Sequence, residues 1–437
     1  DLQDVKFHSL KQIYGIHKKI KRLSLGCFKS IPGTMYREIF RLYHLEDLKV
    51  TADVEESSIS VEILRRIGSL KNLQSIKCVG ILRLLLPSML RRLTKLKKLA
   101  LNRNMKGDIK AILNRITSLP QLQALHLYPN EDWKSLGFTF LNNLENLKHL
   151  SLACYVRLSF SHKYYRPFSK LINLESFTFT TGRPDLAPYL IDILDNLPKE
   201  NKIRKLDLDI SPWMGMDILG RSISRLKNVE ELVLEIELNQ RFKNFFHVID
   251  LKLTRFELKL NLQKHSFPDT NGLKIFLERQ TQLKHINMEF GGDSEHILKE
   301  INPTIGNLTS LQTLGLQLWD YQGHIREVRA FFAACSQLTA LIEFKLDYTN
   351  MFYPNDDLAD IVAGLKKLKK LDGLILSIFL SDQRAKTILE LEEFITRRDR
   401  SKIKNVAIYN RDLRVIRIET VYHVNRALER DLKNLCF

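Results

Sequence analysis

The chain has 437 residues, of which 44% are hydrophobic and 27% charged, a composition that excludes an intrinsically disordered protein. Its formal charge of +18 lies mainly in one half: residues 1–200 hold 32 lysines and arginines against 18 acidic residues, and residues 201–437 hold 36 against 32. The positive electrostatic field of such a chain attracts nucleic acid, an anionic membrane or an acidic protein segment. Because no apolar stretch approaches the roughly 20 residues of a membrane-spanning helix, we expect no transmembrane segment.

The five cysteines are far apart in the sequence and include no C-x-x-C pair. An odd number without such a pair argues against a disulfide framework and against a zinc site. We therefore expect no cofactor and no metal. The same cysteine pattern favours a reducing, intracellular compartment, with the cytoplasm as the expected location.

A phrase of the form L-x-x-L-x-L recurs along the chain at intervals of 23 to 32 residues. In a short strand alternate side chains face opposite ways, so the apolar residues of each phrase point to a core and the others to solvent. One repeat buries little by itself, and neighbouring repeats must stack to form a continuous core with parallel strands. Fifteen strands are predicted, in phrases that begin at Ile20, Leu45, Leu73, Leu96, Leu122, Leu147, Leu174, Ile203, Val229, Leu253, Leu283, Leu311, Leu341, Leu371 and Ile403.

Between the strands the apolar spacing changes to three and four residues, which predicts helices with one buried face. The repeats lengthen after Leu253, so we expect the longer helices in that part of the chain. The helical spacing is clearest at Ile297, Ile301, Ile305, Val328, Phe331 and Phe332.

The sequence contains no linker rich in proline, glycine or serine, so we expect one continuous domain with a cover at each end. Residues 1–19 are predicted to form an N-terminal cap, and residues 20–418 an α/β solenoid. Residues 419–437 are predicted to form a capping helix, because Val421, Val424 and Leu428 follow helical spacing among charged residues. Such caps cover the core that a terminal repeat otherwise exposes.

The phrases Leu96-x-x-Leu99-x-Leu101-x-x-Asn104 and Leu122-x-x-Leu125-x-Leu127-x-x-Asn130 resemble the leucine-rich-repeat family, including its asparagine. The resemblance covers roughly residues 15 to 418. It implies a curved horseshoe of about fifteen repeats, with a parallel sheet on the concave side and helices on the convex side. It also implies that the concave strands bind another protein. Within the family, residues 67–76 and 305–314 resemble repeats of plant-type intracellular immune receptors, and the longer C-terminal repeats resemble those of F-box adaptors.

No catalytic motif of the forms G-x-S-x-G, H-E-x-x-H, G-x-G-x-x-G or G-x-x-x-x-G-K-[ST] occurs in the chain. We therefore expect a protein that is not an enzyme. Cys154 follows a predicted strand and is interpreted as a small buried residue rather than a nucleophile. His126 and His149 take outward positions on neighbouring strands, where they could pair with each other, and are interpreted as solvent-facing.

The outward positions of each phrase define the predicted concave surface. The early strands present a basic strip with one aromatic residue, and the middle strands present acidic residues. The acidic residues could hold a divalent cation, although a solvated acidic patch is the favoured interpretation. The predicted partner-binding residues are Arg22, Lys49, Lys77, Lys98, Arg103, His126, Tyr128, His149, Asp207, Asp209, Glu231 and Glu235.

A second group of basic residues precedes consecutive strands at similar distances. Residues at similar offsets stack in a repeat protein, so these residues are predicted to form a ridge along one edge. A solvated charged face is the favoured interpretation of this ridge. The residues of the basic edge ridge are Arg65, Arg66, Arg91, Arg92, Lys95 and Arg115.

Taken together, these features predict a scaffold or recognition module without catalytic activity, which docks an acidic region of another protein on its concave strands. One alternative is a ligand-sensing or substrate-recognition repeat domain of a larger regulatory protein, such as an immune receptor or a ubiquitin-ligase adaptor. The other alternative is a basic subunit of a large assembly that contacts RNA or another anionic surface.

Overall fold

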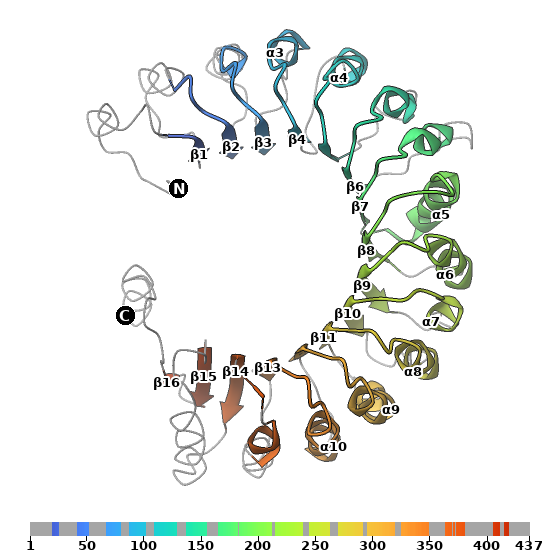
Figure 1. The fold of residues 1–437 in the computed structure, drawn as a ribbon, viewed down its shortest axis with the longest axis vertical. Helices are drawn as coiled ribbons and strands as arrows, with labels where there is room; N and C mark the ends of the chain where they lie inside the picture. The colour runs from blue at the N-terminus through green and yellow to red at the C-terminus, as the bar shows by residue number, and fades with distance from the viewer. Residues whose placement is uncertain are drawn as a thin grey trace. The chain divides into compact units, whose positions relative to one another are not determined.

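The computed structural model describes residues 20–25, 42–51, 67–79, 87–101, 109–128, 137–154, 165–181, 183–211, 215–238, 244–262, 270–291, 295–319, 325–348, 363–368, 370–371, 373–380, 405–410 and 415–418. The chain forms two compact units, unit 1 up to Ser211 and unit 2 from Pro212. Within each unit the strands lie side by side and the helices lie along one side of them (Figure 1). The predicted caps, residues 1–19 and 419–437, lie outside the described residues.

The described part of unit 1 contains eight strands, each of which pairs in parallel with the next along the chain. All are short, between four and six residues, as expected for one strand per repeat. They are β1 (Arg22–Leu25), β2 (Asp47–Thr51), β3 (Ser75–Val79), β4 (Lys98–Leu101), β5 (Ala124–Leu127), β6 (His149–Ala153), β7 (Ser176–Thr180) and β8 (Lys205–Ile210).

The described connections of unit 1 contain α-helices in some repeats and 3-10 helices in others. A 3-10 helix rises further per residue than an α-helix, so it spans the width of a short repeat with fewer residues. The connections include α3 (Pro87–Arg92), α4 (Ile109–Ile116), η6 (Thr139–Asn143), η8 (Arg166–Lys170), η9 (Pro184–Leu186) and α5 (Ala187–Asn196).

Unit 2 repeats the same arrangement with longer elements. Its described helices include α6 (Met216–Ser224), α7 (Phe245–Val248), α8 (Thr270–Glu278), α9 (Glu295–Gly306) and α10 (Ile325–Cys335). The longest of these five, α9 with 12 residues and α10 with 11, fall in the long repeats as predicted. The strands are β9 (Glu231–Leu238), β10 (Arg255–Leu262), β11 (His285–Gly291), β12 (Thr313–Trp319), β13 (Glu343–Tyr348), β14 (Gly373–Leu380), β15 (Asn405–Asn410) and β16 (Val415–Ile418).

All fifteen predicted strands are present, and each begins two residues after the first residue of its phrase, from Arg22 after Ile20 to Asn405 after Ile403. Strands β9 to β15 pair in parallel in chain order. The sixteenth strand, β16, was not predicted and pairs antiparallel to β15. Only residues 411–414 join the two strands, whereas a parallel crossover needs a dozen residues or more, so the direction has to reverse.

The core of each unit consists of the apolar phrase positions and the inward faces of the helices. Leu48 and Leu125, for example, are buried on β2 and β5. In unit 2, Phe246, Phe256 and Phe276 come from α7, β10 and α8, and their ring centroids lie 5.0 to 6.4 Å apart. The repeats are therefore joined by side chains that cross from one repeat to the next. No helix within the described ranges is both long and apolar enough to cross a bilayer.

Candidate binding surface

The strands of unit 1 carry rows of side chains on the face that points away from the core. Neighbouring strands pair with the same phrase position opposite, so each position forms a row across the strands. The first row is Arg22, Asp47, Ser75, Lys98, Ala124, His149, Ser176 and Lys205, and the second row is Ser24, Lys49, Lys77, Ala100, His126, Ser151, Thr178 and Asp207.

Four cations of these rows, Arg22, Lys49, Lys77 and Lys98, form what we call the basic strip. All four are exposed, and within the part of the chain that the structure describes none of them makes an ion pair. Lys49 and Lys77 lie directly opposite each other on β2 and β3. Like charges directly opposite each other repel, so the pairing of Lys49 with Lys77 favours an anionic partner at this part of the strip.

His126 stands at the end of the basic strip and takes part in a local network. Its Nδ1 lies 2.5 Å from Ser151 Oγ in a hydrogen bond, and its ring packs against Tyr128 with the centroids 4.8 Å apart. Burial, and then the charge of Lys77, lower the pKa of His126. His149 is exposed and lies opposite Ala124, so the two histidines occupy different rows. Ser151 was not among the predicted site residues, although it lies opposite His126 at the same phrase position.

The pKa of His126 in the folded chain should lie below 6.5 and should rise, while staying below 6.5, when Lys77 is replaced by methionine. The substitution removes the positive charge of Lys77, which is the smaller cause of the lowered pKa, and leaves the larger cause, the burial of His126, unchanged. The pKa of His126 is lower in the folded chain than in the unfolded chain, so well above pH 6.5 this residue does not affect stability. As the pH falls from 6.5 through the folded pKa, protonation of the unfolded chain lowers the free energy of unfolding. An NMR titration of the imidazole resonances measures both values, and a wild-type pKa at or above 6.5 would contradict the burial argument.

Three of the four predicted acidic residues, Asp207, Asp209 and Glu235, already have an interaction partner. Asp207 and Asp209 on β8 are half-buried and each has an interaction partner. In unit 2, Glu231 lies opposite Arg255 on β10, and Glu235 Oε1 lies 2.8 Å from Lys259 Nζ. Among the described residues, no three His, Cys, Asp or Glu side chains gather where they could hold a metal ion.

The basic edge ridge is described only in part. Arg91 and Arg92 are exposed in the last turn of α3, and Lys95 is exposed just after it. Arg115 in α4 differs, because it is half-buried and its Nε atom is enclosed. Arg65 and Arg66 of this ridge lie outside the described residues, as does Arg103 of the predicted concave surface.

Cys154 is 3% exposed, and burial raises its pKa to about 12. A thiol with this pKa carries its proton at neutral pH and is a poor nucleophile. The structure therefore fits the interpretation of Cys154 as a buried residue of the core.

The comparisons with known proteins found matches among solved structures. No protein-family model and no curated protein matches the sequence. A leucine-rich-repeat protein of Leptospira interrogans is 16% identical, with 91% of this chain and 98% of that chain covered and a TM-score of 0.38. A chain of the TLR13–ssRNA13 complex is 16% identical, with 84% and 57% covered and a TM-score of 0.39. A chain of the Toll–Spatzle complex of Drosophila is 12% identical, with 80% and 53% covered and a TM-score of 0.36.

This chain thus spans just over half the length of the chains matched in the TLR13–ssRNA13 and Toll–Spatzle complexes. Its own geometry carries the assignment of the fold: the recurrent L-x-x-L-x-L phrase, the buried apolar positions of that phrase and the parallel strands paired position by position. The chain has the α/β solenoid fold of the leucine-rich-repeat proteins.

Proposed function

We propose that this chain is a protein-binding module without catalytic activity, and that the basic strip of unit 1 docks an acidic segment of another protein. The observation that carries the proposal is the direct pairing of Lys49 with Lys77, both exposed and without an ion pair among the described residues. An acidic segment laid across β1 to β4 would neutralise a repulsion that the fold leaves in place.

The size of the surface agrees with this function. Eight strands about 4.8 Å apart span about 34 Å, which accommodates a standard interface of about 800 Å² per partner. Charges of both signs along this face, with Asp207 and Asp209 on β8, favour a partner whose own charges follow the opposite order. A long nucleic acid, which is uniformly negative, would meet repulsion at β8.

The test is reversal of charge in the basic strip by Lys49→Glu, Lys77→Glu and Lys98→Glu in one chain. These side chains are exposed, so the variant should fold as the wild type does. Proteins captured by the two chains from native extract are compared by mass spectrometry, and the partner lost from the variant is purified. Calorimetry with that partner should show binding weakened by about 100-fold, as expected when three exposed charge contacts become repulsions.

The matched control changes the net charge equally at exposed residues in the connections of unit 1, by Lys110→Glu, Lys170→Glu and Lys199→Glu. Its affinity should stay within about twofold of the wild type, because these residues lie away from the strands. Equal loss in both variants, or no loss in either, would refute the proposal. Selective loss of RNA, with an affinity that falls steeply with salt, would replace it with the RNA-binding alternative.

A further inference from the structure

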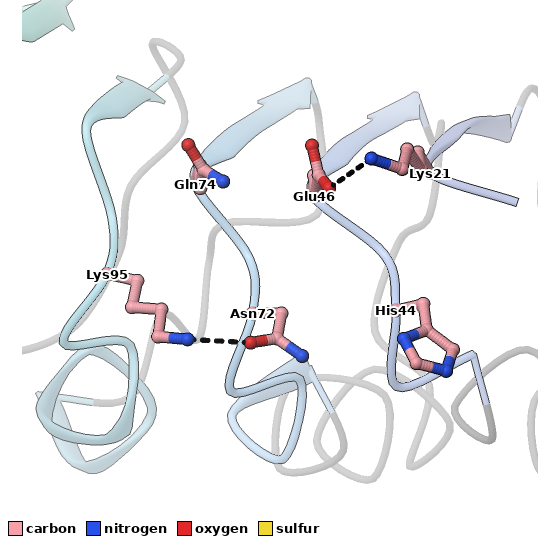
Figure 2. Close-up of a pocket in the computed structure, with 6 residues that line it drawn as sticks. All are labelled: Lys21, His44, Glu46, Asn72, Gln74 and Lys95. Atoms are coloured by element: carbon pink, nitrogen blue, oxygen red, sulfur yellow. Dashed lines mark hydrogen bonds and ion pairs between the residues drawn. The ribbon is translucent and has the colours of Figure 1, made fainter.

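A polar pocket of about 330 Å³ lies at the edge of unit 1 where strands β1 to β4 begin. Its lining comes from two positions of the repeat. One set of residues directly precedes strands β1, β2 and β3, and the other set lies three residues before strands β2, β3 and β4. Figure 2 shows the first set above the second, with Lys95 directed toward Asn72 and Lys21 toward Glu46. The lining residues are Lys21, His44, Glu46, Asn72, Gln74 and Lys95.

The two lysines of the pocket are positioned by neighbouring repeats but keep donors for a ligand. Lys95 Nζ donates to Asn72 Oδ1 at 2.8 Å, and Asn72 Nδ2 donates to the Tyr43 carbonyl at 2.9 Å, so the Asn72 amide is fixed at both ends. Lys21 Nζ lies 3.0 Å from Glu46 Oε1 in an ion pair whose side chains are 68% and 40% exposed. An ammonium group has three N–H donors, and each of these contacts uses one of them.

The composition of the lining restricts the ligand. Every lining residue is polar, so the pocket offers an apolar molecule few favourable contacts. The lining holds two lysines and one glutamate, so its net charge is positive. Lysine also binds carboxylates, as Lys21 binds Glu46, but a phosphate group carries more negative charge and more acceptor oxygens than a carboxylate and so uses more of the donors in this lining. Lysine acts as a point charge toward phosphate, and the Gln74 amide and the His44 imidazole offer further donors.

From these features we infer that the pocket binds a phosphate group carried by a polar ligand. A volume of about 330 Å³ is larger than one phosphate ion needs and lies at the lower end of small-molecule sites. The ligand is therefore a phosphorylated side chain of a protein or a small phosphorylated molecule. The pocket shares no residue with the basic strip, so a test of this inference does not depend on the proposed function.

The test measures the affinity of the full chain for inorganic phosphate, for O-phosphoserine and for the blocked peptides Ala-phosphoserine-Ala and Ala-Ser-Ala by calorimetry. The phosphorylated probes should bind and Ala-Ser-Ala should not. Lys95→Gln should weaken their binding by about tenfold, since a hydrogen bond to a charged group is lost. Glu46→Gln should strengthen it severalfold, because the substitution removes a repelling carboxylate and releases Lys21. If Glu46 and Lys21 had only a structural role, Glu46→Gln would not increase the affinity for the phosphorylated probes.

The matched control is Lys202→Gln. Lys202 Nζ donates to Asn173 Oδ1 at 2.8 Å, the same bond that Lys95 makes, but Lys202 does not line the pocket. Its substitution removes one charge and one contact between repeats and should leave phosphate affinity unchanged. Absence of binding by the wild type, equal weakening by Lys202→Gln, or weakening by Glu46→Gln would overturn the inference. Tighter binding of the phosphopeptide than of O-phosphoserine identifies a protein side chain as the ligand, and equal binding identifies a small molecule.

Discussion

Replacement of Gln280 by leucine should lower the free energy of unfolding by about 2–4 kcal/mol. Gln280 is 2% exposed and joins two repeats through their backbones. Its Oε1 accepts the Leu253 N–H at 3.0 Å, and its Nε2 donates to the Leu251 carbonyl at 3.0 Å and to the Phe276 carbonyl at 3.3 Å. Leucine has a similar size but no polar atoms, so it would leave buried backbone groups without partners.

Urea denaturation followed by circular dichroism measures this loss, provided that the transition of unit 2 is resolved. The control is Gln282→Leu, two residues further along, where the side chain is exposed and the cost should stay within about 0.5 kcal/mol. If the two variants lose the same stability, the hydrogen bonds of Gln280 do not stabilise the junction between these repeats.

Replacement of Phe276 by alanine should cost about 3–5 kcal/mol, the largest effect of a single substitution expected here. The ring is fully buried in α8, and its centroid lies 5.0 Å from that of Phe256 and 5.7 Å from that of Phe246. Alanine would therefore leave a cavity at the contact of two helices with a strand, and it would also remove the edge-to-face contact with Phe256.

The matched variant is Phe276→Leu, which keeps most of the buried volume and should cost about half as much or less. The same denaturation experiment compares the two. Equal losses would mean that the aromatic contacts, rather than the filled volume, stabilise this junction. A loss below about 1 kcal/mol for the alanine variant would contradict the buried position of the ring.

The strands were predictable from the sequence because one physical requirement repeats in every phrase. Leu23 on β1 and Phe344 on β13 lie far apart in the chain, yet each is buried at the same phrase position. The alternation of a strand places its other residues on the opposite face, so Lys49 and Lys77 could be assigned to one row by counting. The position of a residue within its phrase therefore predicts whether its side chain is buried and in which row of the exposed face it lies.

Features that depend on what fills the space between repeats were not predictable in this way. The pattern around Arg115 is that of an exposed basic position, but the packing of α4 encloses its Nε atom. The direction of β16 follows from the shortness of the loop after β15 rather than from any phrase. The pocket between Lys21 and Lys95 requires side-chain conformations that no spacing rule supplies, although the repeat positions of its residues are regular.

The pairing of each strand with its neighbours in chain order also determines how the solenoid would respond to a pulling force. Hydrogen-bonded partners among the parallel strands are separated by a single repeat of 23 to 32 residues, so tension along the solenoid separates one pair of strands at a time. The outermost repeat would peel away while the remainder stayed folded, and when the tension was released it would find its template strand still in place. Under such a force we expect the chain to extend in small reversible steps, one repeat at a time.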